Sequence, residues 1–321
     1  MAGRIFLNGS DKRMLRLAGR RMPPIVVAGF AALAIAWLGI VYFAEPWGRL
    51  AGSGMDARCY WVPDLADPYL HSNWTDQIAY PYSPAFLQVL QPIRLLPWQA
   101  FMAVWAAILM AAMVYLTGRR LILLGLAFFG LMEIWGGNIE LLVAVAVVLG
   151  FRWPATWSFV LLTKITPGVG LLWFAVRREW RSLAIALGAT AAVVAVSGAL
   201  APDAWSRWAQ VLEANAGKNG TWAAIPIPFV IRCPFAIVLV VWGARANHRW
   251  TVPVSSMLAL PALWYGGLSI MLATLPLLGA RSGDDLRRIA GLARTELEAA
   301  IASARTRRRF GRSVGSTARP D

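Results

Sequence analysis

The sequence has few of the residues that build metal sites, disulfide frameworks and soluble surfaces. Its 321 residues include two cysteines and two histidines, and charged residues make up only 15% of the chain. Cys59 and Cys233 lie far apart in the sequence and have no metal-binding spacing. The cysteine content therefore indicates neither a disulfide framework nor a metal site.

Several motifs that identify common enzyme classes are also missing. The chain has no Walker loop, no Gly-x-Gly-x-x-Gly and no His-Glu-x-x-His motif, so no nucleotide donor is indicated. An Asp-x-Asp motif, which would suggest metal-held sugar diphosphates, is absent too, and Asp64 and Asp67 are spaced too loosely to replace it. We expect no metal and no cofactor.

What the sequence has in abundance is apolar side chains. Hydrophobic residues make up 58% of the chain and the mean hydropathy is +0.56, which predicts several membrane spans. The formal net charge of +15 does not indicate nucleic acid, because Lys and Arg cluster at the ends of apolar runs and in the tail. There they are typical of topology signals and of contacts with anionic lipid headgroups.

The first apolar run extends from Ile25 to Phe43 and follows a basic N-terminal segment, residues 1–24. It is longer than the core of a usual signal peptide, and the residues after it do not resemble a cleavage site. We expect a retained first helix with the N-terminus in the cytoplasm, which places residues 45–97 outside the membrane.

The later basic clusters predict an all-α polytopic membrane protein with about ten crossings and both termini in the cytoplasm. Segment 83–96 is too short to span and is expected at the interface, and 201–223 is expected to be an external loop. The predicted crossings are 25–43, 98–116, hairpins of two helices at 121–151, 153–177 and 252–279, and single spans at 182–200 and 224–243.

The predicted hairpins are short for a membrane. Half a hairpin of about 11–15 residues rises roughly 16–22 Å, against roughly 30 Å of hydrocarbon. Such helices are tolerated around a protein-lined or wet cavity. We therefore expect residues 25–280 to form one membrane domain around a cavity that opens outward beneath the 45–97 loop.

The tail, residues 281–321, is strongly basic and is expected to be cytoplasmic. A modest apolar stripe in it predicts a helix that lies on the membrane surface and anchors the chain. The stripe consists of Leu286, Ile289, Ala293, Leu297 and Ile301.

The polar segment 54–84 is the longest interruption between apolar runs. It holds four Asp, four Tyr and two Trp residues, a combination that suits a sugar because aromatic faces stack on rings and carboxylates accept hydroxyl hydrogen bonds. Within it, Asp56 lies close to the end of the first helix, after Gly52, Ser53 and Gly54. A solvated loop acid is the alternative for Asp56.

Ionisable residues within apolar segments are the other candidates, since a charge at membrane depth is costly and marks a functional site. Lys164 interrupts an apolar segment just before a helix break at Pro167 and Gly168, where an ammonium could hold a lipid phosphate. Arg232 has a similar but weaker claim, and both could instead snorkel to the interface. Asn138 and Glu140 flank a Gly-Gly turn and line the cavity or a solvated tip.

The order and spacing of several short motifs resemble those of a known enzyme family. The motifs are MDARCYW (55–61), DPY (67–69), YPYSP (80–84), GGNIELL (136–142), LLTKITPG (161–168) and RREWR (177–181). Together they resemble glycosyltransferase family 87, polyprenyl-phosphate-sugar-dependent enzymes of the GT-C superfamily that include actinobacterial α-mannosyltransferases. The similarity covers roughly residues 20–245, with Ile139 and Glu140 departing from the family turn. At its C-terminal end the chain is short for this family.

The resemblance implies a GT-C fold and an inverting transfer on the external face. Asp56 would be the general base, and Lys164, with Arg232, would hold the departing lipid phosphate. The remaining candidates for substrate binding are Tyr60, Asp67, Tyr69, Tyr80, Asn138 and Glu140.

The expected partners are a polyprenyl-phosphate-linked sugar donor, a glycolipid or polysaccharide acceptor and membrane lipids with anionic headgroups. Mannose is the expected sugar. An arabinofuranosyltransferase of the same fold and a flippase or transporter of lipid-linked sugars remain open as alternatives.

Overall fold

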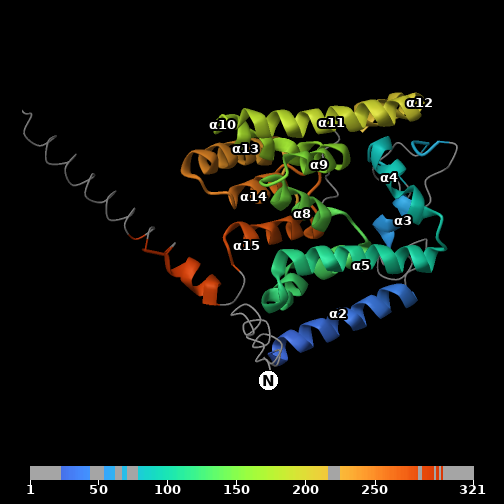
Figure 1. Cartoon of the computed structure of the whole chain (residues 1–321). Coiled ribbons are helices and arrows are strands. Elements are labelled where there is room, and N and C mark those ends of the chain that lie inside the picture. The colour runs from blue at the N-terminus through green and yellow to red at the C-terminus, as the bar shows by residue number, and fades with distance from the viewer. Residues whose placement is uncertain are drawn as a thin grey trace, which may run out of the picture.

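The computed structural model describes residues 23–43, 54–61, 67–70, 79–215, 225–280 and parts of 284–298. These residues form helices, turns and connections without a β-strand, so the expected all-α fold is confirmed for this part of the chain. Figure 1 shows the helices stacked in layers, several of them running roughly parallel or antiparallel to one another.

Four helices are long and apolar enough to cross a membrane, as expected for the four long apolar runs. Their interiors carry almost no charge. Three of them leave most of their side chains exposed, as in helices that face lipid, whereas Trp98–Thr117 is half buried within the protein. These helices are α2 (Pro24–Phe43), α5 (Trp98–Thr117), α11 (Trp180–Leu200) and α13 (Phe229–Ala246).

The three predicted hairpins contain short helices separated by turns. Their helices are not among the four of spanning length, and the number of crossings therefore stays a prediction. The first region holds η1 (Arg119–Leu121), α6 (Ile122–Gly125), the π-helical turn η2 (Leu126–Gly130), α7 (Leu131–Gly136) and α8 (Glu140–Gly150). The second holds η3 (Pro154–Thr156), α9 (Trp157–Thr163), η4 (Thr166–Leu171) and α10 (Leu172–Val176), and the third holds α14 (Thr251–Leu258), η5 (Tyr265–Ala273) and α15 (Thr274–Leu277).

Three further helices lie in the segments expected outside the membrane. They are α3 (Met55–Trp61), α4 (Pro84–Arg94) and α12 (Pro202–Asn215). The segment expected as an external loop, 201–223, begins with a helix, because Pro202 and Asp203 suit a helix start and the Val211 side chain is buried. Its position outside the membrane stays a prediction. Helix α4 has 11 residues, too few to span, as expected.

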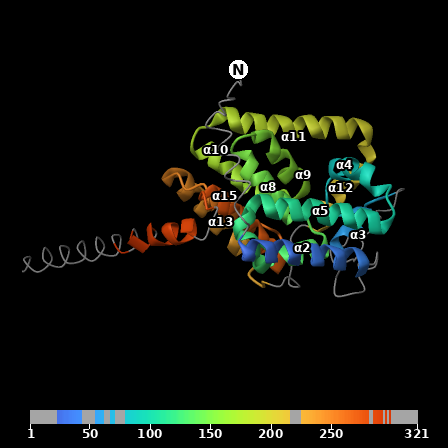
Figure 2. The same cartoon turned by 60° about the horizontal axis from the view of Figure 1, so that its bottom comes forward.

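The helices pack in a consistent order across the body. Helix α2 packs on α5, α5 on α8, α8 on α9, and α9 on α11, so α2 and α11 lie on opposite sides with α5 and α8 between them (Figure 1, Figure 2). Trp157, Trp173 and Phe174 are among the largest fully buried side chains of this core. In the tail, residues 284–292 are helical, and Leu286 and Ile289 pack against the core. The other stripe positions, Ala293, Leu297 and Ile301, lie outside the described residues.

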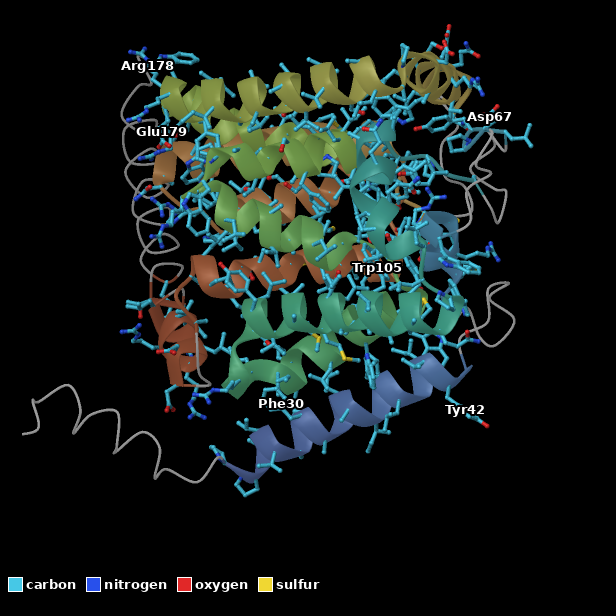
Figure 3. The ribbon with its side chains drawn as sticks, turned by 45° about the vertical axis from the view of Figure 1, so that its right-hand side comes forward. Phe30, Tyr42, Asp67, Trp105, Arg178 and Glu179 are labelled. Carbon is cyan, nitrogen blue, oxygen red and sulfur yellow. The ribbon has the colours of Figure 1, made fainter. Side chains whose placement is uncertain are left out.

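Helix α11 provides a test of topology, since it is one of the four helices that can cross a membrane. Arg178 lies at one end of the body, and Asp67 and Tyr42 lie at the other (Figure 3). In a variant without Cys59 and Cys233, we expect Ser206→Cys to react with a membrane-impermeant maleimide in intact cells. Arg178→Cys should react only after permeabilisation, and labelling of both variants in intact cells would contradict the predicted topology.

Candidate active site

The candidate base Asp56 lies in α3, which is held against the turn between α7 and α8. The backbone N–H of Gly54 donates to the carbonyl of Trp135 at 2.8 Å, immediately before α3 begins. On the other side of the turn, Trp105 Nε1 of α5 donates to the carbonyl of Gly137 at 2.6 Å. These two bonds fix α3 and α5 to the same turn.

Two glycines allow α3 to approach this turn closely. Gly137 has a φ of +78°, and a Cβ at this position would lie 2.5 Å from the Cβ of Ala57. A Cβ at Gly136 would lie 3.1 Å from Asp56 Oδ2. The Gly-Gly turn expected from the sequence is therefore confirmed, and its lack of side chains is what lets the Asp56 carboxylate reach it.

An ion pair links the same turn to the helix break after α9. Lys164 Nζ forms an ion pair with Glu140 Oε1, and the side chains are 19% and 4% exposed, respectively. Glu140 is the first residue of α8, and its backbone N–H donates to Glu133 Oε2 at 3.2 Å. Lys164 directly follows the last residue of α9. The start of α8 and the end of α9 thus bring a carboxylate and an ammonium group into contact.

Asp56 is close enough to this pair for both charges to act on its carboxyl group. The pKa of Asp56 is raised to about 7, chiefly by burial and also by the charge of Glu140, whereas Lys164 and Arg58 act to lower it. Asp56 as a whole is partly buried. A carboxyl group with a pKa near neutrality has the acidity that suits a general base.

The tyrosines expected to contact a sugar form a buried wall beside Asp56. Tyr60 and Tyr82 hydroxyls are 3.1 Å apart, and Tyr60 also donates to Asn138 Oδ1 at 3.5 Å. Tyr69 donates to the carbonyl of Tyr82 at 3.0 Å, and Tyr80 donates to that of Ser83 at 3.3 Å. Because these hydroxyls bond to protein groups and the rings are buried, the tyrosines position the 79–83 segment. The role of Tyr82 was not predicted, although it stands in the YPYSP motif.

Two predicted binding residues lie in other surroundings. Asp67 forms an ion pair with Arg207 at 3.3 Å and accepts a hydrogen bond from the backbone N–H of Tyr69. Arg232 is buried, and its guanidinium donates at 2.7–3.0 Å to backbone carbonyls on both sides of it. These carbonyls belong to Ile227, Leu258, Leu260 and Pro261. Arg232 therefore joins the start of α13 to the connection between α14 and η5.

The described part of the chain contains no group of three or more His, Cys, Asp or Glu residues that could hold a metal ion. Of the acids near the turn, Glu140 forms an ion pair with Lys164. The chemistry that this arrangement supports is proton acceptance by Asp56 beside a fixed ammonium group.

A comparison with protein-family models identifies the chain's relatives. The model of glycosyltransferase family 87 matches residues 80–293, which is two thirds of the chain. The chain belongs to glycosyltransferase family 87. No curated protein and no solved structure matches the sequence.

The family 87 match includes the Gly-Gly turn, Glu140 and Lys164. It begins after α3, so the role of Asp56 depends on its motif and on the geometry described above. It also continues beyond residue 245, where the sequence resemblance had ended, and covers α14, η5 and α15.

The close approach of α3 predicts that Gly137 tolerates no side chain. Gly137→Ala should lower the free energy of unfolding by more than about 1 kcal/mol, because it combines a positive φ with a clash against Ala57. Thermal unfolding of the purified protein in detergent measures this loss. Gly188→Ala is the matched control, since a Cβ there meets no atom within 4 Å. Equal stability of the two variants would contradict the described packing.

Proposed function

We propose that this protein moves a sugar from a polyprenyl-phosphate donor to a lipid-linked or cell-envelope glycan acceptor, with inversion at the anomeric carbon. Membership of family 87 shows a glycosyltransferase. The observation that supports the finer proposal is the position of Asp56, against the Gly-Gly turn and within electrostatic range of the Glu140–Lys164 pair. Mannose is the proposed sugar, and the external face is the proposed side of reaction.

In this proposal Asp56 accepts a proton from the acceptor hydroxyl. The acceptor oxygen then forms a bond to the anomeric carbon as the bond from that carbon to the phosphate oxygen breaks. The electron pair of the broken bond stays on the polyprenyl phosphate, which gains one negative charge. A positioned base of this kind contributes about 10²–10⁴-fold to the rate.

Lys164 is the group proposed to stabilise the leaving phosphate. Its ammonium has three donors, and Glu140 occupies one of them, which leaves donors for phosphate oxygens. Glu140 holds the ammonium in place before the donor arrives, so little reorganisation accompanies the reaction. Since the phosphate is already a fair leaving group, the proposal needs no second carboxylic acid, no metal and no cofactor.

The other residues have supporting roles in this proposal. Tyr60 and Asn138 are hydrogen-bonded to each other and line the part of the site that takes the acceptor. Tyr69 and Tyr80 hold the 79–83 segment in position. Arg232 stabilises the fold through its four carbonyl bonds and is not proposed to contact the phosphate.

The test is the Asp56→Asn variant, which keeps the size and hydrogen bonding of the side chain but removes the proton acceptor. With polyprenyl-phosphate mannose and membrane glycolipids, mass analysis should show product from the wild type and at least about 10²-fold slower turnover in the variant. The variant should insert, unfold at the normal temperature and still bind the donor.

Asp64→Asn and Asp76→Asn are the controls from the same loop, and both should keep most of the activity. Near-normal transfer by a well-folded Asp56→Asn protein would exclude Asp56 as the base. Transfer of arabinofuranose instead of mannose would change the proposed sugar but not the mechanism. If the protein moved lipid-linked sugars across a bilayer without transferring a sugar, the proposed enzyme activity would be wrong and the protein would be a flippase.

A further inference from the structure

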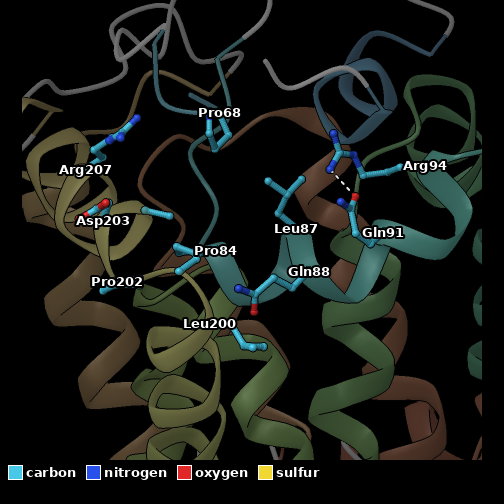
Figure 4. A pocket seen from close by; sticks show the side chains of 12 residues that line it. Pro68, Pro84, Leu87, Gln88, Gln91, Arg94, Leu200, Pro202, Asp203 and Arg207 are labelled. Atoms are coloured by element: carbon cyan, nitrogen blue, oxygen red, sulfur yellow. Dashed lines mark hydrogen bonds between the residues drawn. The ribbon is translucent and has the colours of Figure 1, made fainter. Parts of the chain in front are cut away.

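A pocket separate from the candidate active site around Asp56 lies between α4, the end of α11 and the start of α12. Its volume is about 400 Å³. Arg94 lies on α4 and Arg207 on α12, and Leu87, Gln88 and Leu200 also line the pocket (Figure 4). The pocket thus combines basic groups with apolar side chains.

The pocket is separated from the candidate active site by α4. The pocket-lining residues Leu87, Gln91 and Arg94 recur at helical spacing along one face of α4. The other face buries Phe86 and Leu90 in the hydrophobic core, where Phe86 contacts the ring of Tyr60. A ligand in the pocket would therefore contact α4 without entering the site around Asp56.

The pocket lies at the end of a helix that can cross a membrane. Leu200, the last residue of α11, lines it, and α12 turns away immediately after. Trp205 Nε1 donates to Ser197 Oγ at 3.0 Å, and Trp208 Nε1 donates to the carbonyl of Pro81 at 3.1 Å, which fixes α12 at this level. Tryptophans at the end of a span are typical of the depth of lipid headgroups.

An apolar side chain that lines the pocket is largely exposed. Leu200 is 73% exposed, and Leu95, directly after the last residue of α4, is 83% exposed. Water disfavours such a surface, whereas the boundary between headgroups and acyl chains suits it. The molecule that fits this setting is an amphiphile.

The basic groups of the pocket have capacity for a further anion. Arg94 Nη1 donates to Gln91 Oε1 at 2.7 Å, and a guanidinium group carries further N–H donors that phosphate oxygens can accept. Arg207 pairs with Asp67, but the two side chains are 42% and 30% exposed, and such a surface pair is weak enough to exchange for another anion. Asp203 also lines the α12 wall, so the α4 wall carrying Arg94 is the more positive side.

We propose that this pocket binds the phosphate group of an anionic membrane lipid, with Arg94 as the main contact and Arg207 as the second. The guanidinium groups would bind phosphate oxygens, and the glycerol and upper acyl carbons would pack on Leu87 and Leu200. This site is distinct from the donor site and requires no sugar transfer. A lipid bound there would contact both α12 and α4, and the other face of α4 packs against the candidate active site.

The test measures lipid binding by the full-length protein purified in detergent. Native mass spectrometry and thermal unfolding are recorded with phosphatidylglycerol, with phosphatidylcholine and with inorganic phosphate. We expect the wild type to bind phosphatidylglycerol at least about tenfold more tightly than phosphatidylcholine, and Arg94→Gln/Arg207→Gln to lose this difference. Because inorganic phosphate cannot pack on Leu87 and Leu200, it should raise the unfolding temperature less than the lipid does.

Arg245→Gln is the matched control, since it removes an exposed arginine from α13 and should leave the lipid preference unchanged. Arg94→Lys/Arg207→Lys keeps both charges and should retain most of the preference, which separates charge from a folding defect. Unchanged preference in the double Gln variant would overturn the proposal. Equal stabilisation by inorganic phosphate would overturn it as a lipid site.

Discussion

The ion pair between Glu140 and Lys164 is the interaction on which the arrangement of the site depends. It joins the start of α8 to the break after α9, and both groups are largely removed from water. Removing one partner of a buried pair typically costs about 3–5 kcal/mol, because it leaves an uncompensated charge. The pair therefore fixes the distance between two short helices, and it leaves Lys164 with donors that point away from Glu140.

The Gly-Gly turn brings this ion pair close to Asp56. Gly136 and Gly137 lie four and three residues before Glu140, so the turn that admits α3 also carries the carboxylate that holds Lys164. Trp105 fixes the turn from α5, a helix long enough to span the membrane. A helix of spanning length thus sets the position of the proposed base and of a cation that lie on other segments, which is the preorganisation that electrostatic catalysis needs.

The sequence predicted the parts of the fold that depend on local pattern. The long apolar runs became α2, α5, α11 and α13, and the glycines at 136–137 became a turn. The pairing of Lys164 with Glu140 was not predicted, because the two residues are 24 positions apart. Lys164 was explained as an ionisable group within an apolar segment, and Glu140 as a residue that flanks the Gly-Gly turn. The carbonyl contacts of Arg232 were not predicted either, since three of the four carbonyls come from a segment more than 25 residues away.

The account makes Asp56 a base whose pKa is near 7, and the pH dependence of transfer tests this most directly. The proposed donor is a phosphodiester and the proposed acceptor group is a neutral hydroxyl. Neither would titrate near neutrality, so an ionisation there would belong to the enzyme. We predict that kcat/KM rises with pH as one group of pKa about 7 loses its proton, and then levels off. Lys164→Ala should move this rise to higher pH, because Lys164 lowers the pKa of Asp56. A rate that stays constant through neutral pH, or a rise that is the same in the Lys164→Ala variant, would contradict the account.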